Sequence, residues 1–125
     1  MSRELRETVL ELCGILDDRK AEDIVAVDVA DKTIIAEWFI ICSGTSMAHV
    51  KALCDEVDEK YPENELTLKR IEGYDSARWI VMDFGSILIH IFYPEEREYY
   101  KMERLWIDSP EACINYSHDI EARLI

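Results

Sequence analysis

The sequence predicts an α/β fold in which a mixed five-stranded sheet is flanked by helices. Three observations predict this fold. Three segments carry apolar residues at helical spacing, five short runs are rich in β-branched or aromatic residues, and the two kinds of segment are interleaved along the chain. A chain of 125 residues has the length of one ordinary domain, so we expect no second independent core.

The N-terminal part begins with a helix followed by two strands. Apolar residues at spacings of three and four predict an amphipathic helix over residues 3–17. Two runs, residues 24–29 and 38–42, predict strands on either side of a polar break at residues 30–33. Both strands are apolar on both faces, which is typical of a sheet with helical cover.

A small-residue loop, Ser43-Gly44-Thr45-Ser46, leads into a second helical stripe over residues 47–61, which Pro62 ends. Such a loop can bind an anion through its backbone N–H groups, but serine or threonine there can also simply cap the helix. The loop has neither a Walker lysine nor a three-glycine pattern, so capping is favoured and phosphate binding stays open.

A hairpin over residues 78–92 follows a short strand at residues 66–71. Gly85-Ser86 suits a two-residue turn, which makes Phe84 face Ile87 and sets the register. One side of the hairpin is then core, formed by Ile80, Met82, Ile89 and Ile91. The other side, which we call the Trp79 face, carries Trp79, Val81, Asp83, Leu88, His90 and Phe92.

The Trp79 face allows two interpretations. A carboxylate and an imidazole seldom belong to a buried wall unless they are paired, so Asp83 and His90 can interact beneath a covering helix. Alternatively, the face is a partly exposed patch anchored by Trp79, since aromatic anchors dominate the energetics of interfaces.

The last predicted helix opens with Pro94-Glu95-Glu96, a proline and acids in the first turn. Its apolar side consists of Tyr99, Met102, Leu105 and Trp106. Residues 108–110 break the helix, so we divide the chain into one domain over residues 1–106 and a C-terminal extension over residues 107–125. The extension is either an acidic tail or a second small helix.

The charge and the cysteines restrict the partners. With 14 basic and 27 acidic residues the net charge is −13, which disfavours free nucleic acid and favours a basic protein. Cys13, Cys42, Cys54 and Cys113 lack metal-ligand spacing, so we expect no metal and buried, reduced thiols. The absence of a targeting segment and of a membrane-length apolar run indicates a cytoplasmic protein.

Catalytic patterns are weak in this sequence. Asp83-Phe84-Gly85 matches the metal-binding triplet of protein kinases, but the other kinase motifs are missing. Nucleotidyl transfer needs paired carboxylates for two metal ions, whereas Glu72 and Asp83 are isolated acids. We therefore expect no enzyme, no catalytic residue and no cofactor.

Several motifs together resemble the ribosomal silencing factors, the Iojap-like family. They occupy residues 21–25, 38–46, 72–74, 78–85, 90–97 and 103–106. The resemblance implies a nucleotidyltransferase-like fold without catalytic residues, and a factor that binds the large ribosomal subunit through its protein number fourteen. That factor blocks association with the small subunit, represses translation, and tends to be a homodimer when free.

The same resemblance implies a partner-binding surface centred on Trp79. Its other members are Arg78, Asp83, His90 and Phe92 around the tryptophan, with Glu96, Tyr99 and Tyr100 at the edge. Two alternatives remain. One is a homodimeric adaptor whose Trp79 face is covered by its own copy. The other is a nucleotide-binding or nucleotidyltransferase-like enzyme that uses the Ser43 to Ser46 loop.

Overall fold

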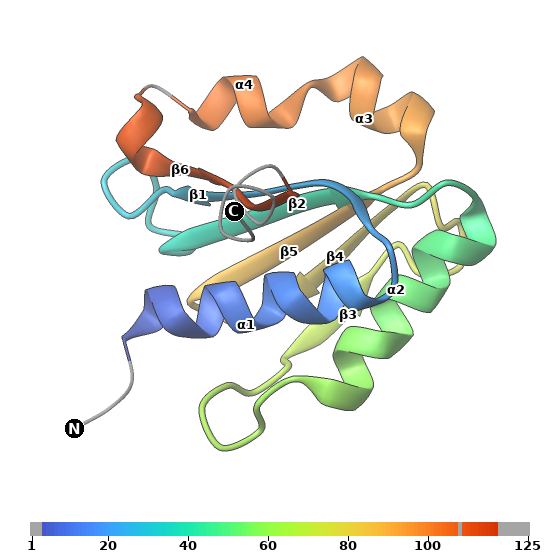
Figure 1. Cartoon of the computed structure of the whole chain (residues 1–125), viewed down its shortest axis with the longest axis horizontal. Coiled ribbons are helices and arrows are strands. Elements are labelled where there is room, and N and C mark those ends of the chain that lie inside the picture. Colours follow the sequence, from blue (N-terminus) through green and yellow to red (C-terminus); the bar gives the residue numbers. More distant parts are fainter. Residues whose placement is uncertain (1–3, 108, 118–125) are drawn as a thin grey trace, which may run out of the picture.

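A computed structural model describes residues 4–107 and 109–117 of the chain. One mixed sheet is covered on one side by α1 and α2 and on the other by α3 and α4 (Figure 1). Along the chain the elements are α1 (Leu5–Asp18), β1 (Glu22–Asp28), β2 (Trp38–Ser43), α2 (Met47–Lys60), β3 (Arg70–Glu72), β4 (Trp79–Asp83), β5 (Ile87–Phe92), α3 (Pro94–Tyr100), α4 (Met102–Trp106), the 3-10 turn η1 (Pro110–Ala112) and β6 (Cys113–Asn115).

The sheet has six strands in the order β3-β4-β5-β2-β1-β6. Only the β2–β5 pair among these strands is parallel, which confirms the mixed sheet. The predicted count of five strands was wrong, because β6 pairs with β1, with Ala26 opposite Ile114. A strand of three residues has no visible periodicity of its own, so it forms only where the edge of β1 supplies hydrogen-bond partners. It lies within the predicted extension.

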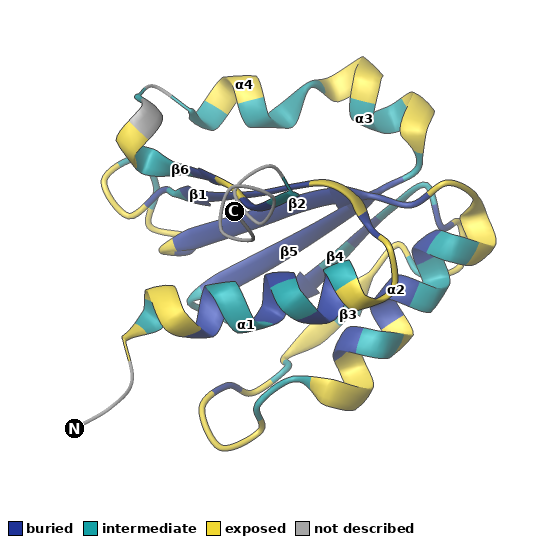
Figure 2. Ribbon diagram, in the orientation of Figure 1, coloured by how far each residue is buried: buried dark blue, intermediate teal, exposed yellow. Residues whose placement is uncertain are grey.

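The main core lies between the sheet and the helices α1 and α2. Figure 2 shows the buried colour along β2 and β5 and on the inward sides of both helices. Fully burying one such aliphatic side chain stabilises a fold by about 1.5–3 kcal/mol. The predicted core side of the hairpin is confirmed, since all four of its members are fully buried: Ile80, Met82, Ile89 and Ile91.

The hairpin register is also confirmed. Pairs run from Trp79 opposite Phe92 to Asp83 opposite Leu88, and the Phe84 N–H donates to the Ile87 carbonyl at 2.9 Å. The preceding strand is shorter than expected, because β3 covers Arg70–Glu72 rather than residues 66–71.

The predicted helix after Pro94 is broken into two. Lys101 adopts a left-handed conformation with φ of +46°, which ends α3 and turns the chain into α4. This turn rotates part of the predicted apolar side outward, so Tyr99 is 80% and Leu105 76% exposed. Met102 and Trp106 of that side do pack against the sheet.

Arg97 holds the two short helices against the ends of β1 and β2. Its guanidinium donates to the Glu103 carboxylate at 2.8 Å, to Ser43 Oγ at 2.9 Å and to the Asp23 carbonyl at 2.9 Å. Because Glu103 lies in α4 and Arg97 in α3, this one side chain spans the break at Lys101.

The four cysteines are free thiols. Cys13, Cys42 and Cys54 are buried, as predicted, whereas Cys113 is half-buried. Burial raises the pKa of Cys42 to about 12, with a small opposing influence of Arg97. A thiol with so high a pKa carries almost no thiolate near neutral pH and is a poor nucleophile.

Candidate functional site: the Trp79 face

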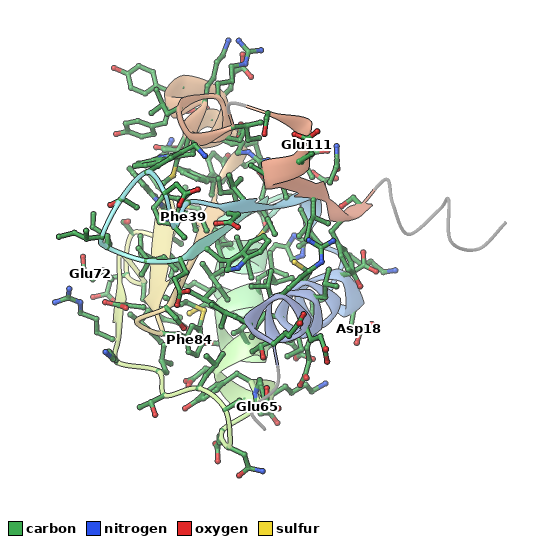
Figure 3. All side chains as sticks on the ribbon, turned by 90° about the vertical axis from the view of Figure 1, so that its left-hand side faces the viewer. Asp18, Phe39, Glu65, Glu72, Phe84 and Glu111 are labelled. Atoms are coloured by element: carbon green, nitrogen blue, oxygen red, sulfur yellow. The ribbon has the colours of Figure 1, made fainter. Side chains whose placement is uncertain are left out.

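The Trp79 face is covered over one half and open over the other. In Figure 3, Phe39 lies toward the α3–α4 segment, whereas Phe84 lies toward α1 and α2. The Trp106 ring packs edge-on against Phe39 with centroids 5.1 Å apart. Over β4, by contrast, Trp79 and Val81 remain half-buried, so part of this side of the sheet is accessible to a partner.

Three neighbouring rings fix the Trp79 indole. It stacks on Phe92 with centroids 4.9 Å apart and an interplanar angle of 27°, and the Tyr100 ring lies 4.9 Å away. Its Nε1–H donates to His90 Nδ1 at 3.1 Å. A side chain held by stacking and a hydrogen bond loses little conformational freedom on binding, so the Trp79 ring is preorganised.

His90 is neutral and buried, with 5% of its surface exposed. Because Nδ1 accepts the indole hydrogen bond, the ring proton resides on Nε2. Desolvation lowers the pKa of His90 from 6.5 to about 4, so the imidazole stays uncharged near neutral pH.

The interpretation that pairs Asp83 with His90 was wrong. Asp83 Oδ1 instead accepts the Gly85 N–H at 2.8 Å, and its other oxygen lies 3.5 Å from Arg70 Nε. The carboxylate is therefore used at the hairpin turn and at the neighbouring strand, away from the imidazole. The remaining interpretation, a partly exposed patch anchored by Trp79, agrees with the burial of this face.

Arg78 links β4 to the first turn of α3. Its guanidinium donates to the Glu96 carboxylate and to Glu95 Oε2, the latter at 3.0 Å, and lies 4.9 Å from the centroid of Tyr93. The hydrogen bond that Arg78 donates to the Glu96 carboxylate is the main cause that raises the pKa of Arg78. This ion pair places two carboxylates beside Tyr100 and hence beside the Trp79 ring.

The structure brings together seven of the eight residues of the predicted binding surface, at different depths below the surface. Asp83 is the exception, because it lies at the other end of β4, where it contacts Gly85 and Arg70. Phe92 is fully buried and His90 nearly so, which makes them the floor beneath Trp79 rather than its surroundings. Tyr99 and Tyr100 are 80% and 46% exposed. Arg78, Asp83 and Glu96 lie between these extremes, each paired with a neighbouring charge or backbone N–H group.

The sequence analysis did not identify the surface beside Val81 on the open part of the Trp79 face. A hollow of about 180 Å³ beside Val81 is lined by Ile35, Arg70, Glu72, Asp83 and Leu88. Ile35 is 64% and the adjacent Ile34 104% exposed, in the loop between β1 and β2. The sequence did contain a signal for this part of the surface. Ile34 and Ile35 follow the polar break at residues 30–33 directly, and two adjacent large apolar residues are unusual in a loop that is exposed to solvent.

The Ser43 to Ser46 loop is used to cap α2. Ser46 Oγ accepts the His49 N–H at 3.0 Å, which confirms the capping interpretation. The Thr45 N–H donates to His49 Nδ1 at 2.9 Å, and His49 Nε2 in turn contacts the Arg19 carbonyl at 2.8 Å. The Gly44 N–H donates to the Phe92 carbonyl at 3.0 Å, so two backbone donors of the loop, those of Gly44 and Thr45, are already paired within the chain.

Two kinds of feature, a metal site and a membrane-spanning helix, are absent from residues 4–107 and 109–117. No group of three or more His, Cys, Asp or Glu side chains in this part of the chain is arranged to hold a metal ion. Within the same residues, no helix combines the length and apolarity needed to cross a bilayer.

Known proteins share this sequence and fold. Residues 2–123 match the family described as "Ribosomal silencing factor during starvation". The ribosomal silencing factor RsfS of Bacillus subtilis is 40% identical over 100 residues, which are 80% of this chain and 85% of that protein. The mouse protein named "Mitochondrial assembly of ribosomal large subunit protein 1" is 35% identical over 98 residues, 76% of this chain and 43% of its own length.

Two solved structures have the same fold as this chain. A crystal structure of a Chromobacterium violaceum protein superposes with a TM-score of 0.78 at 32% identity, covering 83% of this chain and 87% of that one. One from Bacillus halodurans gives 0.71 at 36% identity, with 81% and 94% covered. The family match covers nearly the whole length of the sequence, and the Bacillus subtilis relative is 40% identical. This chain therefore belongs to the ribosomal silencing factor family.

Proposed function

We propose that this protein represses translation by binding the large ribosomal subunit through its protein number fourteen and so blocking association with the small subunit. The observation that carries the proposal is the preorganised Trp79 on an otherwise half-open sheet face. Fixed aromatic anchors of this kind supply most of the binding energy at protein interfaces. The name of the mouse relative points, for that protein, to the large subunit.

The charge of the chain supports a protein rather than RNA as the direct contact. A net charge of −13 repels phosphate backbones and attracts the basic surface of a ribosomal protein. In this proposal the protein acts in the cytoplasm, and it blocks the small subunit sterically, which requires no catalytic residue.

The test is co-sedimentation of purified large subunits with the wild type, Trp79→Ala and Met47→Ala, followed by addition of small subunits. Met47 is a matched control, because it is an apolar side chain 43% exposed on α2, on the other side of the sheet. We expect Trp79→Ala to weaken binding by at least about thirtyfold, the cost of losing a hot-spot residue, while Met47→Ala binds like the wild type and lowers the yield of joined ribosomes. Wild-type protein that stays in the supernatant contradicts the proposal.

A second proposal concerns the free protein, which we infer pairs with its own copy. The exposed Ile34, Ile35 and Tyr99 around the Trp79 face favour this. Sedimentation equilibrium should then show a dimer for the wild type and a monomer for Ile35→Ser. A monomer at all concentrations contradicts it.

A further inference from the structure

The two short helices beside the Trp79 face bury little of their own surface. No residue of α3 or α4 is buried, and both helices lie on the same side of the sheet (Figure 1). Helices of only seven and five residues are not stable on their own in water, and most helices are held in place by burying an apolar side. Specific side-chain contacts therefore have a large share in determining where this segment lies.

Tyr100 connects this segment to Trp79. Its ring lies 4.9 Å from that of Trp79 and 6.4 Å from that of Phe92, between centroids. Tyr100 is the last residue of α3 and is followed directly by Lys101, whose left-handed backbone is unfavourable for a residue other than glycine. The position of the Tyr100 ring thus depends on contacts that hold this break in the helix.

Arg97, one turn before Tyr100, supplies such contacts. Three different nitrogens of its guanidinium donate to three acceptors: Nε to the Glu103 carboxylate, Nη1 to Ser43 Oγ and Nη2 to the Asp23 carbonyl. The acceptors belong to α4, β2 and β1, so one side chain fixes the end of α3 relative to all three elements. Only 14% of the Arg97 side chain is exposed, so solvent and salt screen its ion pair with Glu103 weakly.

We propose that Arg97 is a positioning residue for partner binding, which acts by holding the end of α3 so that Tyr100 stays against Trp79. The proposal rests on the function proposed above and deepens it. Without these contacts Tyr100 moves away from the indole, and Trp79 then loses more conformational freedom when it binds a partner. The loss of affinity arises although Arg97 itself faces the ends of β1 and β2.

The experiment compares the affinity of purified large subunits for the wild type, Arg97→Lys and Arg104→Lys. The two substitutions are chemically identical and keep the charge, but Arg104 is exposed on α4. Lysine has a single nitrogen, which cannot serve three acceptors that lie in three directions. We expect Arg97→Lys to bind about threefold to tenfold more weakly and Arg104→Lys to bind within about twofold of the wild type.

A double-mutant cycle with Tyr100→Ala distinguishes positioning from a general loss of structure. If Arg97 acts through Tyr100, adding Arg97→Lys to Tyr100→Ala should change the affinity by less than about twofold, because the contact it maintains is already gone. An equal loss of affinity in the presence and in the absence of the Tyr100 ring would contradict the proposal, since a general loosening of the fold weakens binding in both backgrounds.

A second pair of variants keeps the proposal testable if Arg97→Lys does not fold. Glu103→Gln removes the charge that faces Arg97, and Glu98→Gln is its control, an acid of α3 whose side chain is 80% exposed and pairs with Lys101. We expect Glu103→Gln to weaken binding by about twofold to fivefold, but not in the Tyr100→Ala background, and Glu98→Gln to bind like the wild type.

The outcomes separate the two proposals. If Trp79→Ala loses binding while Arg97→Lys and Glu103→Gln bind like their controls, the positioning role is wrong and the proposed function stands. If the wild type itself does not bind large subunits, both proposals fall.

Discussion

At the residue scale, one hydrogen bond connects Trp79 to a titratable group. Trp79 Nε1–H requires an unprotonated His90 Nδ1, and burial keeps the imidazole neutral by lowering its pKa to about 4. The geometry of the Trp79 face and the protonation of His90 beneath it are therefore coupled. Protonation both breaks this hydrogen bond and places an unpaired charge under the Trp79 face.

This coupling predicts a pH-dependent stability. In the unfolded chain the pKa of a histidine is near 6.5 and in the native protein that of His90 is about 4, so between these values the unfolded state binds more protons. The free energy of unfolding should consequently fall as pH falls from 6.5 to 4, by about 1.4 kcal/mol per pH unit from His90 alone.

The measurement is urea unfolding of the wild type and His90→Phe at pH 7, 6 and 5. Carboxylates titrate in both proteins, so the informative quantity is the difference between the two stabilities. We expect the free energy of unfolding of the wild type, minus that of His90→Phe, to decrease as the pH is lowered below 6.5. Parallel pH profiles would show that His90 is not responsible.

At the scale of elements, two glycine turns set the position of β4, which carries Trp79. Gly73 has φ of +81°, and a Cβ there would lie 2.2 Å from the Trp79 carbonyl oxygen. Gly85, at the hairpin turn, has φ of +84°, but its Cβ would meet only the end of the flexible Lys69 side chain, at 3.0 Å. Both glycines thus have a left-handed backbone conformation, but Gly73 is surrounded by rigid backbone and Gly85 by a flexible side chain.

Alanine substitution should separate these two turns. Both changes carry the left-handed penalty of about 1–2 kcal/mol, but Gly73→Ala must also displace the backbone of Trp79. We expect Gly85→Ala to lower the free energy of unfolding by about 1–2 kcal/mol and Gly73→Ala by more than about 3 kcal/mol. Denaturant unfolding measures both, and equal losses would contradict the backbone clash.

At the scale of the whole molecule, the sheet is completed by the chain beyond residue 107. β6 covers the outer edge of β1, and the Ile24 N–H donates to Ser117 Oγ at 3.1 Å. Ile114 and Tyr116 are 5% and 9% exposed, so this segment contributes apolar burial to the main core. We therefore propose that residues 109–117 belong to the folded domain.

Truncation after Ile107 tests this extent of the domain. We expect the truncated protein to lose at least about 3 kcal/mol of unfolding free energy, since each of two large side chains contributes about 1.5–3 kcal/mol. It should also aggregate, because an uncovered edge strand pairs with other chains. Asn115→Ala, at an exposed position of β6, is the control and should stay within about 0.5 kcal/mol of the wild type. Thermal unfolding and light scattering are the two readouts, and a truncated protein as stable as the wild type would limit the domain to residues 1–106.

Local patterns determined most of the fold. The stripes of α1 and α2, the strands β1 and β2, and the hairpin register with both of its faces were predictable, because helical spacing, strand alternation and a two-residue glycine turn are decided by near neighbours. The register derived from the Gly85-Ser86 turn also predicted correctly that Trp79 lies opposite Phe92.

Only the tertiary structure decided three other features: β6 on the edge of β1, the break at Lys101, and the partners of His90 and Asp83. The pairing of β6 with β1 joins segments far apart in the chain, and the partners of His90 and Asp83 are selected among several groups that the hairpin brings close. Arg97 can hold α3 and α4 to the sheet only once Ser43 and Asp23 are brought beside it, 54 and 74 residues away. A sequence pattern records the preferences of neighbours along the chain, whereas such long-range contacts are selected by the packing of the whole molecule.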